Sequence, residues 1–80
     1  MKRFPRLAIG LDGSELDIRS MSRAELIVLR NLAHSVIMTH IYLYARTYRR
    51  KSEWPVFSSS EKAAHRLSYD VIGELFRRIT

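Results

Sequence analysis

The chain has no cysteine, three glycines and two prolines among its 80 residues. The lack of cysteine excludes a disulfide scaffold, a thiolate zinc site and cysteine catalysis, and it is compatible with a reducing compartment. The first residues are basic, but no apolar run of signal-peptide length follows them. We therefore expect a cytoplasmic protein. The length predicts a single domain over 1–80.

Glycine and proline are both absent from residues 22–50, a stretch rich in leucine, alanine, arginine and isoleucine. The stretch opens on a capping box, because the Ser22 hydroxyl can accept from a first-turn amide while the Glu25 carboxylate reaches back. Met21 and Leu26 are placed for a hydrophobic staple. We predict one long central helix over 22–50, about 43 Å in length.

Acidic residues are absent between Glu25 and Glu53, while cations gather near the end of the predicted helix. These cations are Arg46, Arg49, Arg50 and Lys51. Cations at this end complement the helix dipole, which is the structural interpretation. The alternative is a patch for nucleic acid or an acidic partner. A net charge of +6 keeps nucleic acid among the partners to be tested.

Catalytic motifs are also missing. The sequence contains no glycine-rich phosphate loop, nucleophile elbow or kinase signature. His34 and His40 are about 120° apart on a helix and cannot share a metal as an i, i+4 pair can. His40 and His65 fall in apolar arcs, and we interpret them as core histidines with local hydrogen bonds. We predict a protein that is not an enzyme and has no cofactor or metal.

Residues 6–19 alternate apolar and polar or small residues on both sides of Asp12-Gly13, which is typical of a β-hairpin. An extended arm with a turn is the alternative. In the hairpin, one face is predicted to carry Leu7, Ile9, Leu16 and Ile18.

A second capping box, Ser58 with Glu61, opens a helix predicted over 59–79. Its solvated back is expected to hold Lys62, Arg66, Asp70, Glu74 and Arg77. The connection over 51–57 carries Trp54, Val56 and Phe57, which we interpret as a lid folded back onto the helix ends, with a partner anchor as the alternative. The predicted fold is mainly α: a long antiparallel helical hairpin, about 22–50 and 59–79, with an N-terminal β-ribbon or extended arm.

The apolar run over 26–45 has the length of a membrane span. It includes Arg30, Asn31 and His34, which are costly in hydrocarbon. We therefore favour a soluble chain with no membrane partner.

The first helix is predicted to be apolar over more than half of its circumference at 100° per residue. One helix and a small ribbon cannot cover so wide a surface, whereas a homodimer or another protein could. We predict partner-binding residues on its mixed face and in the connection: Val28, Met38, Tyr42, Arg46, Arg49 and Trp54.

Two long antiparallel helices in a short, cysteine-free chain resemble the quorum-sensing antiactivators of rhizobial-type bacteria, helical hairpins that bind a transcriptional activator directly. The resemblance covers 22–50 and 58–79 as a helix pair and includes no residue motif, and the N-terminal ribbon departs from it. It implies a bacterial regulatory protein that sequesters a transcription factor. The alternative is a small basic DNA-binding regulator acting as a dimer, although the cations fall in two separated clusters.

Overall fold

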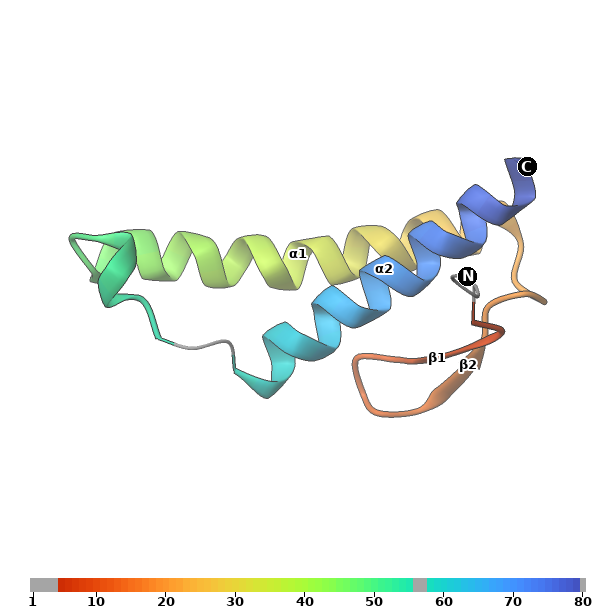
Figure 1. Ribbon diagram of the computed structural model, residues 1–80, viewed down its shortest axis with the longest axis horizontal. Coiled ribbons are helices and arrows are strands. Elements are labelled where there is room, and N and C mark those ends of the chain that lie inside the picture. Colours follow the sequence, from red (N-terminus) through yellow and green to blue (C-terminus); the bar gives the residue numbers. More distant parts are fainter. Residues whose placement is uncertain (1–4, 56–57, 80) are drawn as a thin grey trace.

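A computed structural model describes residues 5–55 and 58–79. It contains strands β1 (Leu7–Ile9) and β2 (Glu15–Asp17), helix α1 (Arg23–Thr47), the short 3₁₀ helix η1 (Lys51–Glu53) and helix α2 (Ser59–Ile79). The strands pair as an antiparallel ribbon, and α2 returns across α1 to form a helical hairpin (Figure 1). The predicted fold class is confirmed. Val56 and Phe57 of the predicted lid lie outside the described residues.

Both predicted capping boxes are present. At α1 the Glu25 amide donates to Ser22 Oγ at 3.1 Å, and the Ser22 amide donates to Glu25 Oε1 at 2.9 Å. At α2 the reciprocal bonds between Ser58 and Glu61 are both 3.3 Å. Each box satisfies backbone donors that a helix start leaves without a partner, so these local residues determine where both helices begin.

Helix α1 ends at Thr47, one turn earlier than the predicted end at 50. Tyr48 is extended, with φ −114° and ψ 143°, although its amide still donates to the Tyr44 carbonyl. Because the helix ends here, the chain turns back through η1 and the Trp54 ring packs on the Tyr44 ring, with the two ring centres 5.7 Å apart. We attribute the early end to this aromatic packing, which a continued helix would prevent.

The ribbon register differs from the prediction. Ala8 pairs with Leu16, so the face toward the core carries Ala8, Leu16 and Ile18. Leu7 and Ile9 point the other way and are exposed. The reason is the turn: the Gly10 amide donates to the Ser14 carbonyl and the Gly13 amide to the Gly10 carbonyl, with Gly13 at φ 88°. This closure sets the pairing, and a shift of one residue exchanges the two faces.

The helix with neighbours on two sides is α2, which packs against both α1 and β1 (Figure 1). Its buried stripe consists of Glu61, Ala64, Leu67, Val71 and Glu74. Only Leu26 and Ala33 are fully buried on α1. The prediction placed α1 at the centre, but a helix with a single partner helix buries only one narrow stripe. The core is completed by Ala8 and Ile18 from the ribbon side.

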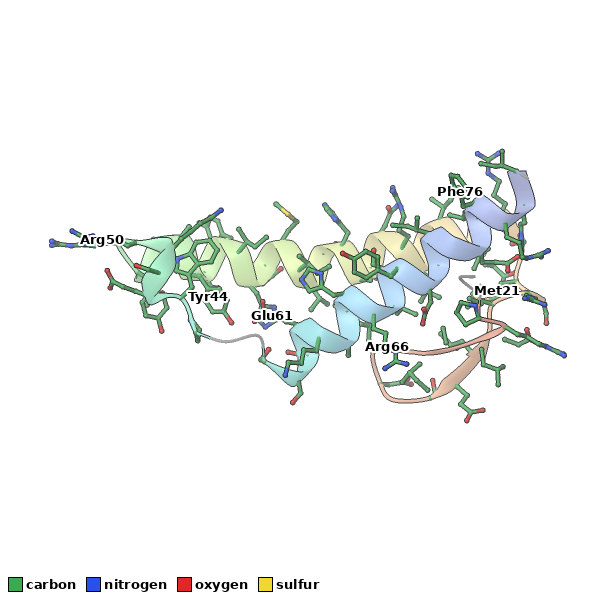
Figure 2. The ribbon with its side chains drawn as sticks, viewed as in Figure 1. Met21, Tyr44, Arg50, Glu61, Arg66 and Phe76 are labelled. Atoms are coloured by element: carbon green, nitrogen blue, oxygen red, sulfur yellow. The ribbon has the colours of Figure 1, made fainter. Side chains whose placement is uncertain are left out.

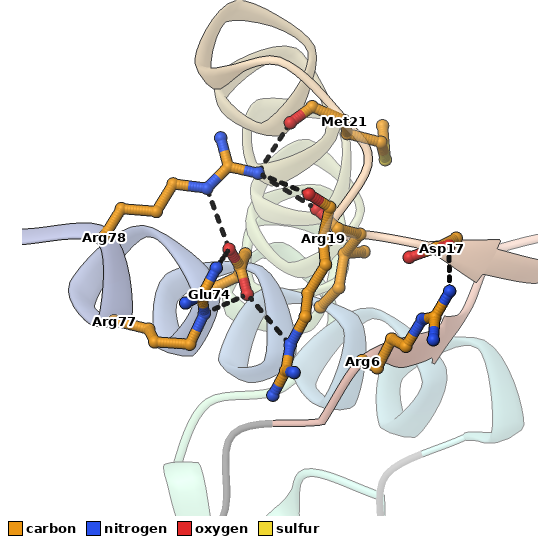
Figure 3. A network of polar contacts seen from close by, with 8 residues as sticks. Arg6, Asp17, Arg19, Met21, Glu74, Arg77 and Arg78 are labelled. Carbon is orange, nitrogen blue, oxygen red and sulfur yellow. Dashed lines mark hydrogen bonds and ion pairs between the residues drawn. The ribbon is translucent and has the colours of Figure 1, made fainter.

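Glu74 was expected on the solvated back of α2, and this prediction is wrong, because the side chain is 0 % exposed. Arg77 donates to its two oxygens at 2.9 and 2.8 Å, and Arg78 Nε donates at 2.8 Å (Figure 3). Arg19 Nε approaches to 3.8 Å. The pKa of Glu74 is lowered to about 2, and the hydrogen bonds from Arg77 are the largest cause. Burial acts in the opposite direction, and the contacts with Arg78 lower the pKa further.

Arg78 also connects α2 to the segment that joins β2 to α1. Its Nη2 donates to the carbonyl of Met21 at 2.6 Å and to those of Ile18 and Arg19 at 3.3 Å each (Figure 3). One guanidinium therefore binds the buried carboxylate and three backbone acceptors. This arrangement fastens the end of α2 to the start of α1.

We predict that Glu74 makes stability depend on acid pH. Its folded-state pKa of about 2 lies below the ordinary 4.5, so its contribution is complete above about pH 4.5 and is lost as pH falls toward 2. Glu74→Gln should lower the free energy of unfolding at pH 7 by roughly 1–3 kcal/mol and flatten its decline in acid. Urea unfolding followed by circular dichroism between pH 2 and 7 measures both.

The matched control is Glu53→Gln, at an exposed position in η1. It should leave stability within about 0.5 kcal/mol of the wild type. An unchanged acid profile for Glu74→Gln would contradict the role given to this carboxylate.

Candidate functional site

The accessible surface area of the chain is larger than that of a compact monomer of the same mass. Its accessible area is 6298 Å², whereas a compact monomer of 9.4 kDa exposes about 5,000 Å². Its radius of gyration is 14.3 Å, against about 12 Å for a compact chain of this length. Seven of the fourteen exposed large apolar side chains among the described residues lie on α1, which has α2 on one side only. This uncovered apolar surface makes α1 the candidate interaction surface of the chain.

Three predicted partner-binding residues lie together on α1, on the side away from α2. Val28 and Tyr42 are each 59 % exposed, and Met38 is 48 % exposed. At 100° per residue they fall opposite Leu26 and Ala33, which face α2. The structure therefore brings these three apolar side chains onto one exposed helix face, as the sequence predicts.

Arg46 joins this face through Tyr42, one turn before it. Its Nη1 donates to the Tyr42 hydroxyl at 2.9 Å, and its Cζ lies 5.6 Å from the centre of the Tyr42 ring. A guanidinium held over an aromatic ring keeps its charge available while its stem covers apolar surface. Arg46 and Tyr42 thus form one amphipathic unit.

Arg49 and Trp54 are not part of this face. Arg49 lies beyond the end of α1, and Trp54 is half-buried against Tyr44. Tyr44 points toward α2, on the opposite side of α1 from Tyr42. Lys51 Nζ covers the Trp54 ring at 5.8 Å. These contacts favour the lid interpretation of Trp54 over that of a partner anchor.

Two leucines that are not among the predicted partner-binding residues extend the exposed face. Leu32 and Leu43 are 53 % and 52 % exposed. At 100° per residue they lie about 20° and 40° beyond Thr39, toward the buried stripe, at the edge of the exposed face. We name the set of these exposed apolar side chains the outer face: Val28, Leu32, Met38, Tyr42 and Leu43. The sequence could have indicated that these leucines are exposed, because one partner helix covers only about a third of the circumference of α1 and the rest of a wider apolar arc stays uncovered.

The outer face is hollowed near the start of α1. A shallow depression of about 390 Å³ there has an almost wholly apolar lining, which includes Met21, Val28, Leu29 and Leu32. Depressions of this kind accept a protruding apolar side chain of a partner.

His40 has the local partners expected of a structural histidine. Its Nδ1 lies 2.8 Å from the Val36 carbonyl oxygen and therefore donates to it, while Nε2 lies 3.5 Å from Ser60 Oγ. Its ring also makes an edge contact with Tyr44, with ring centres 6.0 Å apart. Among residues 5–55 and 58–79, no group of three or more histidines and carboxylates is placed to hold a metal ion.

Glu61 is the second buried carboxylate of α2. Its carboxylate accepts hydrogen bonds from the Tyr44 hydroxyl and from the Ser58 amide. Figure 2 shows Tyr44 and Glu61 facing each other between the helices. Burial would raise the pKa of Glu61, but the hydrogen bonds from Tyr44 and Ser58 outweigh it and lower that pKa. This contact ties the beginning of α2 to the last turns of α1.

The two basic clusters differ in what their charges do. Arg77 and Arg78, with Arg19, neutralise Glu74 inside the protein. The exposed cations near the connection, Arg46, Arg49, Arg50 and Lys51, form no ion pair among the described residues. The two clusters therefore lie at opposite ends of the helical hairpin and do not form a continuous basic stripe.

Helix α1 is also long and apolar enough to cross a membrane, judged by length and composition alone. One such helix is weak evidence of a span, because signal sequences and buried core helices meet the same criterion, although only 11 % of the apolar window of α1 is buried. Its inner side is occupied by contacts with α2, including the bond from Tyr44 to Glu61. Insertion would leave this carboxylate without its donor, which is costly.

Comparison with family models, curated proteins and solved structures finds no match to this chain.

We predict that His40→Gln lowers the free energy of unfolding by about 1–3 kcal/mol, through lost packing on Tyr44 and an altered bond to Val36. His34→Gln, at an exposed position on the same helix, is the matched control and should change it by less than about 0.5 kcal/mol. Urea unfolding measures both. A His40→Gln protein with full stability but no biological activity would argue for chemistry at the imidazole instead.

Proposed function

We propose that this chain is a small non-enzymatic regulatory protein that binds another protein through the outer face of α1. The observation that carries the proposal is the exposure of five large apolar side chains on one side of a single helix. The chain's excess of accessible area, about 1,300 Å² over a compact monomer, exceeds the roughly 800 Å² that each partner buries in a standard interface.

The chemistry of the outer face suits protein recognition. Tyr42 supplies a large, stiff contact, Met38 a side chain that adapts to irregular surfaces, and Arg46 a charged rim beside them. Because Arg46 is already held on Tyr42, little conformational entropy is lost when a partner orders this pair.

For the partner we propose a transcriptional activator that the hairpin sequesters. The support is architectural: two helices packed as a hairpin, with an apolar flank left open, resemble the small antiactivators of rhizobial-type bacteria. Without the activator, the same outer face would pair with that of a second copy, since an open apolar face favours self-association.

DNA binding by a dimer is the second candidate, and the observation that favours it is the basic end near the connection. Against it, Arg19, Arg77 and Arg78 are engaged on Glu74. This leaves few cations in line with the basic end to follow a phosphate backbone. We therefore rank the protein partner first.

We predict that Tyr42→Ala costs about 2 kcal/mol or more of partner affinity while the fold survives, because an exposed aromatic anchor contributes to the interface and not to the core. The immobilised protein is incubated with a host lysate with and without nuclease, and the retained proteins are quantified. The expected result is a protein retained by the wild type, insensitive to nuclease and strongly reduced on Tyr42→Ala.

Lys62→Ala, at an exposed position on α2, is the control and should retain that protein as the wild type does. Nucleic acid recovered without a protein partner, with retention falling steeply between about 50 and 200 mM salt, would support the DNA candidate and overturn this proposal.

We also predict a dimer of the purified chain at micromolar concentration and above, since pairing of outer faces removes apolar area from water. Sedimentation equilibrium should give about twice 9.4 kDa for the wild type. Tyr42→Ala should shift the equilibrium toward the monomer. A monomer at all concentrations would contradict self-association and leave the outer face for a different protein.

A further inference from the structure

A groove of about 580 Å³ lies between the start of α1 and the end of α2. No residue of the outer face lines it, so it is a separate surface. Its floor is apolar and comprises Ile27, Ile72, Leu75, Phe76 and Ile79.

The floor has the repeat of a helix-binding groove. Ile72, Phe76 and Ile79 follow one another at i, i+4 and i+7 along α2, which makes a stripe of about two turns, or roughly 10 Å. Phe76 is 57 % exposed and lies where the end of α2 meets α1 (Figure 2). A partner helix that presents apolar residues at the same spacing would seat on this stripe.

The rim of the groove is cationic. Arg23 and Arg30, seven residues apart on α1, line one side, and Arg78 contributes a third guanidinium. Among the residues that the structure describes, neither Arg23 nor Arg30 forms an ion pair. No carboxylate lines the groove. Arg23 and Arg30 therefore have no carboxylate partner within the described part of the chain. Their spacing of seven residues, about two helical turns, equals that between Ile72 and Ile79 of the floor.

We propose that this groove binds an acidic amphipathic helix of a partner protein. Apolar residues at i, i+4 and i+7 of that helix contact the floor, and aspartate or glutamate residues about seven apart along its flank face Arg23 and Arg30. The proposal goes beyond the outer face and does not rest on it. A second copy of this chain fits poorly, because the copy carries the same +6 charge and its Glu61 and Glu74 are buried.

The probe is a synthetic 14-residue peptide with leucines at i, i+4 and i+7 on one face and glutamates on both flanks, labelled with fluorescein. Binding is measured by fluorescence anisotropy. The double variant Arg23→Glu and Arg30→Glu should weaken binding about tenfold or more, because attraction becomes repulsion. Both positions are exposed, and a glutamate at Arg23 is favourable near a helix N-terminus, so the fold is retained.

The matched control changes net charge equally outside the groove, with Lys62→Glu and Arg66→Glu on α2, and should change Kd by less than about twofold. Phe76→Ser tests the floor and should weaken binding about fivefold or more. A peptide with lysines in place of glutamates should not bind. Circular dichroism of each variant reports the fold.

Equal binding by the Arg23→Glu and Arg30→Glu variant, or by the lysine peptide, would overturn the proposal. So would binding to phosphatidylglycerol vesicles without binding to the peptide, which would identify an anionic lipid site instead. Each of these outcomes leaves the outer face of α1 unaffected, because the substituted residues lie outside it.

Discussion

The buried carboxylate of Glu74 is the constraint on which the tertiary structure depends. An ionised carboxylate inside a small protein is unfavourable unless cations and donors surround it. Here Arg77, Arg78 and Arg19 supply them, and Arg78 continues to the carbonyls of the segment between β2 and α1. The packing of α2 against the start of α1 therefore depends on Arg78, which also neutralises the buried charge of Glu74. The same contact positions Arg78 at the rim of the groove.

Glu61 acts at the other end of the buried stripe of α2. Its bond from Tyr44, together with the bond from Arg78, which Glu74 holds, to the Met21 carbonyl, places a polar contact near each end of an apolar stripe formed by Ala64, Leu67 and Val71. Apolar stripes alone tolerate sliding by one turn, because leucine and valine contacts are not directional. We infer that the two carboxylates define the position of α2 along α1, a role that buried polar groups have in other helix pairs.

Both candidate surfaces follow from the size and shape of the chain. With 80 residues, two helices and a short ribbon, the protein can bury one stripe of α1 and two sides of α2. Apolar side chains on the remaining arcs stay in water at a cost to solubility, and this cost is relieved when a partner covers them. The outer face of α1 and the groove between the helices differ in charge. We therefore propose partners of different chemistry for the two surfaces.

Local sequence determined the helical hairpin, because capping boxes, the absence of glycine and proline, and apolar periodicity act within a few residues. It also determined the exposed group of Val28, Met38 and Tyr42, since helix geometry alone places them together. The tertiary structure decided the rest. The turn at Gly13 set which ribbon face is buried, and packing of Trp54 on Tyr44 ended α1 early. Burial of Glu74 became favourable because Arg77 and Arg78, close to it in sequence, and Arg19, far from it in sequence, surround its carboxylate. Helical periodicity places Glu74 on the solvated side of α2, and only its tertiary surroundings, including Arg19, show that it is buried.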